Sequence, residues 1–399
     1  MRQPSIAIIG AGIGGLVFAH ALRARGFAAD VYEQSAELTE IGAAVALAAN
    51  ANRELERLQL LDDVRVASTE PTELIHRDGR TGVRISSHPV RLGGSYQAQY
   101  GAPYFGIHRA DLQKALSKRF SGAIHLGHRL VSLAETASNV RMKFANGVER
   151  DVEIVVGADG VRSLVRRFVS GESGVIYSKT SAFRGIVPAR NLHALPDPEA
   201  LQFWMGPRAH LLHYAIGKAA EDINFFAVVE GPEAWPYEDR WIVAAQPGDA
   251  TRCFANWHPA VTEMISAGWV DKRWGLFLVQ QPKRWHTGRV VLTGDAAHGM
   301  LPHQGQGANV TIEDVVTLAE LLARRRHEPL VDTFAAYERL RKTRTRSIQR
   351  ASWATNAALH LPDDAALDRR NSVLTRFPER YGWIHGFDAL KSAEAAAGN

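Results

Sequence analysis

The chain contains very little cysteine, with Cys253 as the one thiol in 399 residues. A single thiol cannot form an intramolecular disulfide, so the composition predicts a protein of the reducing cytoplasm. Paired-cysteine and H-x-x-E-H patterns are also lacking, and we therefore expect no metal site.

Long apolar runs are lacking too. No stretch reaches the about eighteen apolar residues that a transmembrane helix needs, so we expect no membrane insertion. The N-terminal run "IAIIGAGIGGLVFAHAL" is interrupted by glycines, and no typical small-residue cleavage site follows it. With 46% hydrophobic and 22% charged residues the composition is that of a globular protein. Its length predicts two domains.

The formal charge of +5 comes partly from an arginine-rich stretch, "RLRKTRTRSIQR", at residues 339–350. Its helical spacing and the absence of interleaved aromatic residues favour a solvated helix face over a nucleic-acid contact. We therefore expect no nucleic-acid partner.

A glycine-rich turn follows the first apolar run. Residues 5–9, "SIAII", predict a buried strand, and Gly10, Gly12 and Gly15 come directly after it. A helical pattern then ends near Gly26, and a second strand pattern ends at Glu33. This βαβ fingerprint predicts a dinucleotide, with its pyrophosphate over a helix N-terminus and its ribose on the acid. The pattern leaves NAD and FAD open.

The rest of the chain alternates between αβ and β patterns. We expect a nucleotide-binding domain over 1–72, 100–173 and 284–350, and a β domain over 73–99 and 174–283. Asp78-Gly79 is typical of a hairpin turn. A C-terminal helical segment is expected over 351–399, with a frayed alanine-rich tail after Lys391.

Three motifs stand in order: "GAGIGG" (10–15), "GADGVRS" (157–163) and "GDAAHGMLPHQGQGAN" (294–309). With "HRADL" (108–112), this set resembles the single-component FAD-dependent aromatic monooxygenases, whose fold is that of p-hydroxybenzoate hydroxylase. The resemblance implies an α/β fold: a Rossmann-like FAD-binding domain with three-layer ββα architecture, interleaved with a mainly antiparallel β-sheet substrate domain, plus C-terminal helices.

The resemblance also implies which residues bind FAD. Gly10, Gly12 and Gly15 would hold the pyrophosphate, Glu33 the adenosine ribose, Arg109 the ribityl and phosphate region, and Asp295 the ribityl chain. The whole predicted set is Gly10, Gly12, Gly14, Gly15, Glu33, Gln34, Arg109, Leu130, Asp159, Asp295, Gly305, Gly307, Ala308 and Asn309.

Physical reasoning supports these assignments and leaves alternatives open. Asp295 ends a buried strand, where a carboxylate needs donors, but it could instead cap the next helix. Asp159 could likewise cap the helix after it. Gly305 and Gly307 leave helix N–H groups free, and such groups favour the anionic reduced flavin.

Four residues are predicted to be catalytic: Pro302, His303, His210 and Tyr214. Pro302 would shape the turn, as in the family, whereas His298 in the same motif is interpreted as structural. His303 resembles a histidine beside the substrate in salicylate hydroxylases, although backbone carbonyls of its turn could satisfy it. In "AHLLHYAIG", His210, Leu212 and Tyr214 share one strand face, which could also face solvent.

Two positions bear on the substrate. Arg184 could bind an anionic substrate or the flavin, with a surface arginine as the alternative. Ala46 stands where the 6-hydroxynicotinate enzymes carry a histidine. The pocket should therefore be more apolar, with Leu47 and Leu212 in its wall.

The predicted function is an FAD-dependent monooxygenase that consumes NADH or NADPH and O2. It would hydroxylate a small electron-rich aromatic or heteroaromatic substrate through a flavin C4a-hydroperoxide. The alternatives are a flavin-dependent oxidase or reductase of the same superfamily, an NAD-dependent dehydrogenase, or a flavin-holding sensor without turnover. A monomer and a homodimer are both compatible with the sequence.

Overall fold

The N-terminal apolar run forms the middle of a parallel sheet in the computed structural model, which describes residues 3–38, 44–171, 174–237, 240–362 and 366–398. The sheet has five strands in the order β19-β12-β1-β2-β8. Their bounds are β1 Ile6–Ile9, β2 Ala29–Tyr32, β8 Ile124–His125, β12 Ile154–Gly157 and β19 Val290–Leu292. All of β1 is buried, as its continuous apolar sequence predicts.

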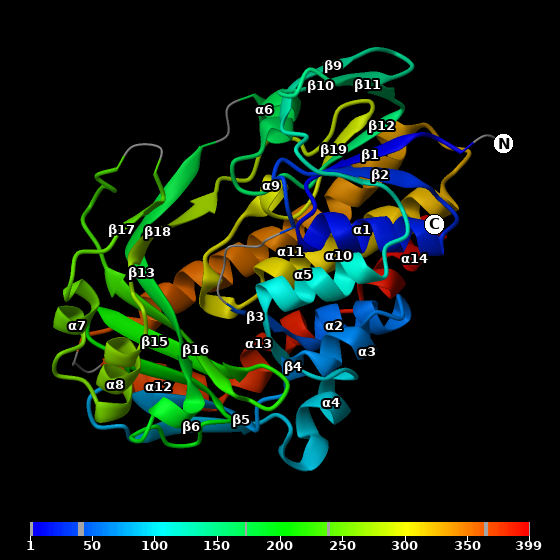
Figure 1. Ribbon diagram of the computed structural model, residues 1–399. Coiled ribbons are helices and arrows are strands. Elements are labelled where there is room, and N and C mark those ends of the chain that lie inside the picture. The colour runs from blue at the N-terminus through cyan, green and yellow to red at the C-terminus, as the bar shows by residue number, and fades with distance from the viewer. Residues whose placement is uncertain (1–2, 39–43, 172–173, 238–239, 363–365, 399) are drawn as a thin grey trace.

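Two further layers cover this parallel sheet. A three-stranded antiparallel sheet supplies one, with β9 Leu130–Glu135, β10 Val140–Phe144 and β11 Glu149–Val152. Helices α1 (Ile13–Ala24), α5 (Arg109–Lys118) and α10 (Gly307–Arg324) supply the other (Figure 1). One continuous hydrophobic core joins the three layers, and the predicted ββα arrangement is confirmed.

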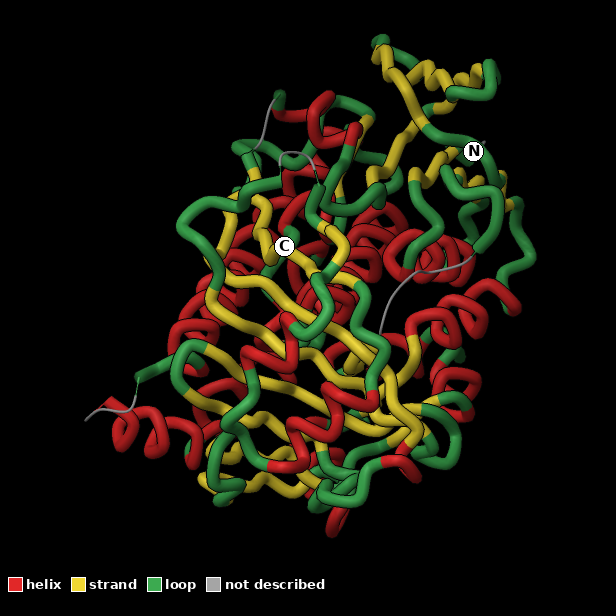
Figure 2. The backbone as a smooth tube through the Cα atoms, turned by 60° about the vertical axis from the view of Figure 1, so that its left-hand side comes forward, coloured by secondary structure: helices red, strands yellow, loops and turns green. Residues whose placement is uncertain are grey.

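A second, eight-stranded sheet has the order β17-β18-β13-β16-β15-β14-β5-β6. Figure 2 shows its strands side by side in the lower part of the molecule. The bounds are β5 Glu73–Asp78, β6 Arg84–Pro89, β13 Val175–Pro188, β14 Leu201–Gly206, β15 Ala209–Ile216, β16 Asp222–Glu230, β17 Ile242–Ala244 and β18 Lys272–Val279. β5 and β6 pair as the predicted hairpin, and all pairings except β14 with β5 are antiparallel.

Smaller elements connect the two sheets. A short sheet consists of β3 (Ala44–Leu47), β7 (Phe105–His108) and β4 (Ser68–Thr69). In the sequence, β3 and β4 precede the β5–β6 hairpin and β7 follows it. The connecting helices are α2 Ala49–Arg57, α3 Leu61–Val66, α4 Ser95–Tyr100, α6 Leu164–Ser170, α7 Asp249–Cys253, α8 Pro259–Ala267 and α9 Asp295–His298. Short 3-10 helices span Leu92–Gly94, Ala189–Asn191 and Pro302–Gln304.

Four helices end the chain: α11 Leu330–Leu359, α12 Ala366–Thr375, α13 Phe377–His385 and α14 Ala389–Ala397. The expected boundary at 350/351 falls inside α11, and the domain division stays a prediction. The predicted fraying after Lys391 is wrong, because α14 packs on α10 and buries Ala393 completely. No helix in the described ranges is both long and apolar enough to cross a membrane.

The arginine-rich stretch 339–350 lies on α11, and the prediction of a solvated face is wrong for two of its residues. Arg341 is buried, and it donates to Glu313 (2.6 Å) and Asp314 (2.7 Å) on α10. Arg344 also pairs with Glu313, at 2.7 Å. A charge pattern within one helix cannot reveal that the neighbouring helix presents two buried carboxylates.

Candidate active site

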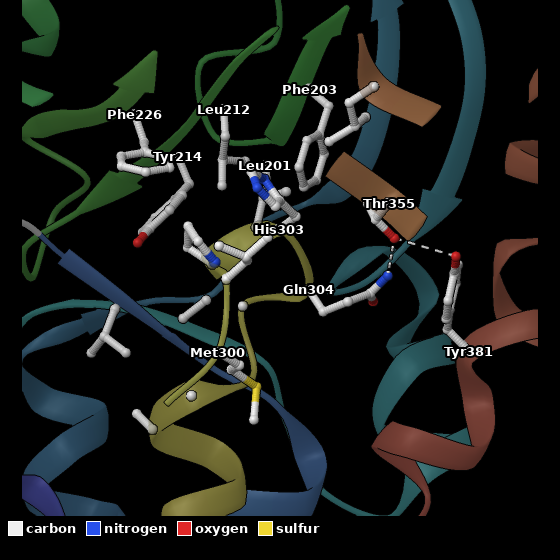
Figure 3. A pocket seen from close by; sticks show the side chains of 18 of the residues that line it. Leu201, Phe203, Leu212, Tyr214, Phe226, Met300, His303, Gln304, Thr355 and Tyr381 are labelled. Carbon is white, nitrogen blue, oxygen red and sulfur yellow. Dashed lines mark hydrogen bonds between the residues drawn. The ribbon is translucent and has the colours of Figure 1, made fainter. Parts of the chain in front are cut away.

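A cavity of about 600 Å³ lies between the carboxyl ends of the parallel strands and the eight-stranded sheet. This edge of an open α/β sheet is the usual place for a ligand. From the parallel side the wall includes Gly12, Gly14, Ala158, Gly160, Asp295, Gly305, Gly307 and Ala308. The facing side chains come from the second sheet, among them Phe203, Leu212, Tyr214 and Phe226 (Figure 3).

Two helices begin at this cavity without a side-chain cap. Gly12 precedes α1 and Gly307 opens α10, and both residues line the cavity. Neither helix has an acidic residue in its first turn. Their first N–H groups therefore remain available, and the positive ends of both helix dipoles favour an anionic group in the cavity.

The glycine fingerprint has a steric explanation. Gly10 has a φ of +108°, a conformation that residues with a side chain rarely adopt. A Cβ on Gly15 would overlap the carbonyl oxygen of Gly10, so helix α1 can approach strand β1 this closely only at glycine. Gly10 and Gly15 thus build the turn, while Gly12 and Gly14 form its cavity side.

Glu33 follows β2 and ties two backbone segments together. One carboxylate oxygen accepts the N–H of Ala11 and the other accepts the N–H of Ser35, each at 2.9 Å. Further lone pairs remain for ribose hydroxyls. Gln34 beside it is exposed, and Leu130 is buried in the core outside the cavity wall. Their predicted contacts with the cofactor stay predictions.

The two aspartates of the motifs behave differently. Asp159 caps α6, since its carboxylate accepts the N–H groups of Leu164 (2.8 Å) and Val165 (3.1 Å). Burial raises the pKa of Asp159. Asp295 lines the cavity, and within the described ranges its side chain has no hydrogen bond from the protein. A ligand hydroxyl fits this acceptor, whereas the helix cap accounts for Asp159.

Arg109 and Arg184 both line the cavity, the first from the start of helix α5 and the second from strand β13. Arg109 is the first residue of α5, where a cation opposes the helix dipole. Arg184 lies in the middle of β13, and burial, followed by the charge of Arg109, lowers its pKa to about 10. Arg184 is half-buried and lines the cavity, so the interpretation of Arg184 as a surface residue is wrong.

The turn that contains His303 brings an imidazole into the cavity wall. Pro302 opens the 3-10 helix, and Gly305 ends it with a φ of +62°. His303 is 4% exposed, and neither ring nitrogen has a hydrogen-bond partner in the described part of the chain. Burial, with a smaller contribution from His360, lowers its pKa to about 3. The alternative in which backbone carbonyls satisfy this histidine is therefore wrong.

His298 and Asn309 fix this turn from below. His298 is buried and pairs with Asp314, which fits its structural interpretation. The side chain of Asn309 accepts the N–H of Ala48 at 2.7 Å and donates to the carbonyls of Ala46 (2.9 Å) and Gly305 (2.7 Å). Asn309 thus joins the start of α10 to β3.

On the facing sheet, β15 alternates as predicted. Leu212 and Tyr214 line the cavity, and His210 lies on the same face. The solvent-facing alternative is wrong, since His210 is 1% and Tyr214 5% exposed. His210 lies outside the cavity wall, with its ring centroid 5.2 Å from that of His303, and its Nδ1 is 2.7 Å from Nε2 of His360. Burial, followed by the charges of His360 and His303, holds its pKa well below the usual value.

Strand β3 contributes three cavity residues, Ala44, Val45 and Ala46. Ala46 lines the cavity, as expected for the position that departs from the 6-hydroxynicotinate enzymes. Leu47 was expected there as well, but it points into the core of the three-layer unit. Leu47 is fully buried in that core and is not part of the cavity wall.

The C-terminal helices also line the cavity, a contribution that was not predicted from the sequence. The residues concerned include Thr355 on α11, Val373 and Leu374 on α12, and Phe377, Tyr381 and His385 on α13. His360 at the end of α11 contacts His210. The cluster of aromatic residues at 377–385 was the one available signal, but packing inside a bundle would produce the same pattern.

Comparison with known proteins agrees with this geometry. The chain matches the family described as FAD binding domain over residues 3–352. It is 35% identical over 388 residues to 3-amino-4-hydroxybenzoate 2-monooxygenase of Streptomyces cremeus, covering 96% of this chain and 95% of that protein. The chain belongs to the FAD binding domain family.

Two further matches extend the comparison. The 6-hydroxynicotinate 3-monooxygenase of Pseudomonas fluorescens is 32% identical over 357 residues, or 88% of this chain and 91% of that protein. The solved structure of a salicylate hydroxylase substrate complex has a TM-score of 0.84 at 25% identity, over 99% of this chain and 98% of that one. The predicted fold, the FAD cofactor and the class of FAD-dependent aromatic monooxygenase are confirmed.

Proposed function

We propose that this enzyme hydroxylates an aromatic or heteroaromatic acid that carries a hydroxyl or amino group, with NADH or NADPH as reductant. The relatives named above act on an aminohydroxybenzoate and on a hydroxynicotinate, which supports this substrate class. The main support from the structure is the composition of the two cavity walls. One wall is made of uncapped helix starts and small residues, and the opposite wall is made of apolar and aromatic side chains on a sheet.

The first wall fits FAD. Gly12 and Gly14 would receive the pyrophosphate, Asp295 the ribityl hydroxyls, and the N–H groups at Gly307 and Ala308 the pyrimidine edge of the flavin. When bound, FAD supplies the redox chemistry that activates oxygen. The dipole of α10 would stabilise negative charge at that edge.

The second wall fits a planar ring. Leu212 and Phe226 would hold the ring by apolar contact and exclude water from the reaction. Tyr214 and His303 face the same cavity (Figure 3) and would position a ring hydroxyl or amino group. Because burial keeps His303 neutral, one of its ring nitrogens would be able to accept a hydrogen bond from a phenolic hydroxyl.

A substrate panel tests this function. The purified protein, loaded with FAD, is given phenolic and heteroaromatic acids, and both NAD(P)H oxidation and hydroxylated product are measured. We expect at least one acid to stimulate oxidation with formation of product. Stimulated oxidation that yields only hydrogen peroxide with every acid would favour an oxidase instead.

A further inference from the structure

One charged side chain in the cavity has no counter-charge. Arg184 lies in the middle of β13, flanked by β16 and β18, and lines the cavity. Its Nε is buried without a hydrogen-bond partner, and within the described ranges no carboxylate pairs with it. A half-buried cation loses part of its hydration, and a partner for its buried Nε offsets this cost. Its charged neighbour, Arg109, adds repulsion.

The faces of the Arg184 guanidinium are already occupied. Its central carbon lies 4.8 Å from the ring centroid of Phe226 and 5.1 Å from that of Trp274. Two aromatic faces hold a planar cation by cation–π attraction and fix its orientation. The edge of the plane, which carries the N–H donors, is the part that remains available. A planar anion such as a carboxylate matches this edge with two parallel hydrogen bonds.

The sheet register places Arg184 in line with the ring-binding wall. Arg184 lies opposite Phe226, Phe226 opposite Leu212, and Leu212 opposite Phe203. These residues all line the cavity. Adjacent strands are about 4.8 Å apart, so the backbone of Arg184 lies roughly 10 Å from that of Leu212, within reach of a long side chain and a benzoate. A ring over Leu212 and Phe226 can thus extend a carboxylate to Arg184.

The phosphates of FAD have another place. Gly12 and the start of α1 lie at the edge of the parallel sheet, whereas Arg184 belongs to the opposite sheet. We propose that Arg184, clamped between Phe226 and Trp274, binds the carboxylate of the substrate and makes the enzyme specific for aromatic acids. This inference rests on the proposed hydroxylation of an aromatic acid.

Equilibrium binding separates the inference from turnover. The probes are 3-amino-4-hydroxybenzoate and the corresponding benzamide, which has the same ring without the charge. Dissociation constants come from the absorbance change of the bound flavin, and in the apoprotein from tryptophan fluorescence, since Trp274 contacts the Arg184 guanidinium. KM values for NADH oxidation are measured in parallel.

Arg184→Gln should raise the dissociation constant of the benzoate roughly 10- to 100-fold, the range expected for a charged hydrogen bond. Binding of the benzamide and of FAD should change less than about threefold, because neither uses the charge. Arg184→Lys keeps the charge but loses the planar fork, and should give an intermediate value. If the Arg184→Gln variant does not fold, the dissociation constants of Arg184→Lys test the inference instead.

Arg273→Gln is the matched control. Arg273 is on β18 next to Trp274, stacks on Phe183 at 5.6 Å and bonds to Ser181, but it lies outside the cavity wall. Arg273→Gln also removes one positive charge and should leave the dissociation constant of the benzoate unchanged. Equal losses for benzoate and benzamide in Arg184→Gln, or an unchanged benzoate constant, would overturn the inference. If no aromatic acid stimulates NADH or NADPH oxidation in the wild type, the proposed function fails instead, whatever these constants are.

Discussion

The two walls of the cavity differ in how their polar groups are satisfied. Below the Gly305–Asn309 turn, the protein bonds its own polar side chains: Asn309 bonds to three backbone groups, and Asp314 bonds to Gly294 and Arg341. Toward the space proposed for the ring, both nitrogens of His303, next to this turn, and the Nε of Arg184, on the second sheet, are buried without a partner in the described part of the chain. The support of the cofactor wall is thus built largely by hydrogen bonds within the protein, whereas groups that face the cavity, Asp295 included, keep polar atoms available for a ligand.

This contrast follows from the cost of burying polar groups. An unsatisfied buried donor or acceptor costs about 1–3 kcal/mol, so a protein keeps one only where something else provides the partner. A cofactor that stays bound needs a preformed cradle, and a substrate that leaves in every cycle provides its hydrogen bonds only while it is present. Predictions that separate the two walls follow, from the largest expected effect to the smallest.

The support of the cofactor wall should be the most sensitive part. Arg341→Ala removes the buried cation that Glu313 and Asp314 share, and leaves Glu313 with Arg344 and Asp314 with His298 as the remaining charged partners. We expect the free energy of unfolding to fall by roughly 3–5 kcal/mol, measured by urea denaturation. Arg346→Ala, an exposed position on the same helix, is the control. Equal losses in both variants would mean that the buried ion pairs contribute nothing specific.

The contact with the cofactor itself is tested at Asp295. Asp295→Ala removes the free carboxylate of the cavity wall and should weaken FAD binding roughly 10- to 100-fold, as determined by flavin fluorescence titration. Asp159→Ala should instead cost stability, about 0.5–2 kcal/mol, because its carboxylate caps α6. An affinity that survives Asp295→Ala would remove this residue from the cofactor site.

The ring wall is tested by two variants that should spare the cofactor. Tyr214→Phe in the cavity wall, and His210→Ala behind it beside His303, should lower turnover, or its coupling to product, by roughly tenfold. This is a modest loss for groups that position a substrate proton, directly for Tyr214 and through His303 for His210. The flavin content of the purified variants should match that of the wild type. Loss of flavin in parallel with turnover would show that these residues support the cofactor wall.

Two buried histidines, His303 in the cavity wall and His360 behind it, should make stability sensitive to acid. The folded pKa values of His303 and His360, about 3 and about 4, lie below the unfolded value near 6.5. Below pH 6.5 the unfolded chain therefore binds more protons, and stability is lost as the pH falls toward 4. Each histidine contributes a slope of about 1.4 kcal/mol per pH unit.

The matched variants for this effect are His303→Asn and His327→Asn. The first should reduce the slope of unfolding free energy between pH 6.5 and 4.5 by about 1.4 kcal/mol per pH unit, measured by urea denaturation. His327 is exposed, and its replacement should leave the slope unchanged. An unaltered slope in His303→Asn would mean that this imidazole is already charged, or exposed, in the folded protein.

The sequence predicted the cofactor wall better than the ring wall, for a physical reason. The first wall is built from local motifs, in which a strand, a glycine turn and a helix are adjacent in the chain, so spacing alone locates Gly10, Asp295 and Gly307. The ring wall depends on strand register and on contacts between distant residues. His210 meets His360 across 150 positions of sequence.

Strand patterns also left the burial of particular residues open. The alternation in β13 indicated which residues share a face of the sheet with Arg184. It could not indicate whether that face is buried or solvated, because both give the same period of two. The contribution of α12 and α13 to the cavity was missed for a similar reason, since an amphipathic helix shows that it packs without showing against what.

The most direct test of the two-wall account is the ratio of hydroxylated product to NAD(P)H consumed by the FAD-loaded enzyme, measured with its best aromatic acid in the wild type and in Tyr214→Phe. We predict a ratio close to one in the wild type and a clearly lower ratio in the variant, at equal flavin content. A wild type that consumes NAD(P)H without forming a hydroxylated ring, or a variant with an unchanged ratio and rate, would contradict the account.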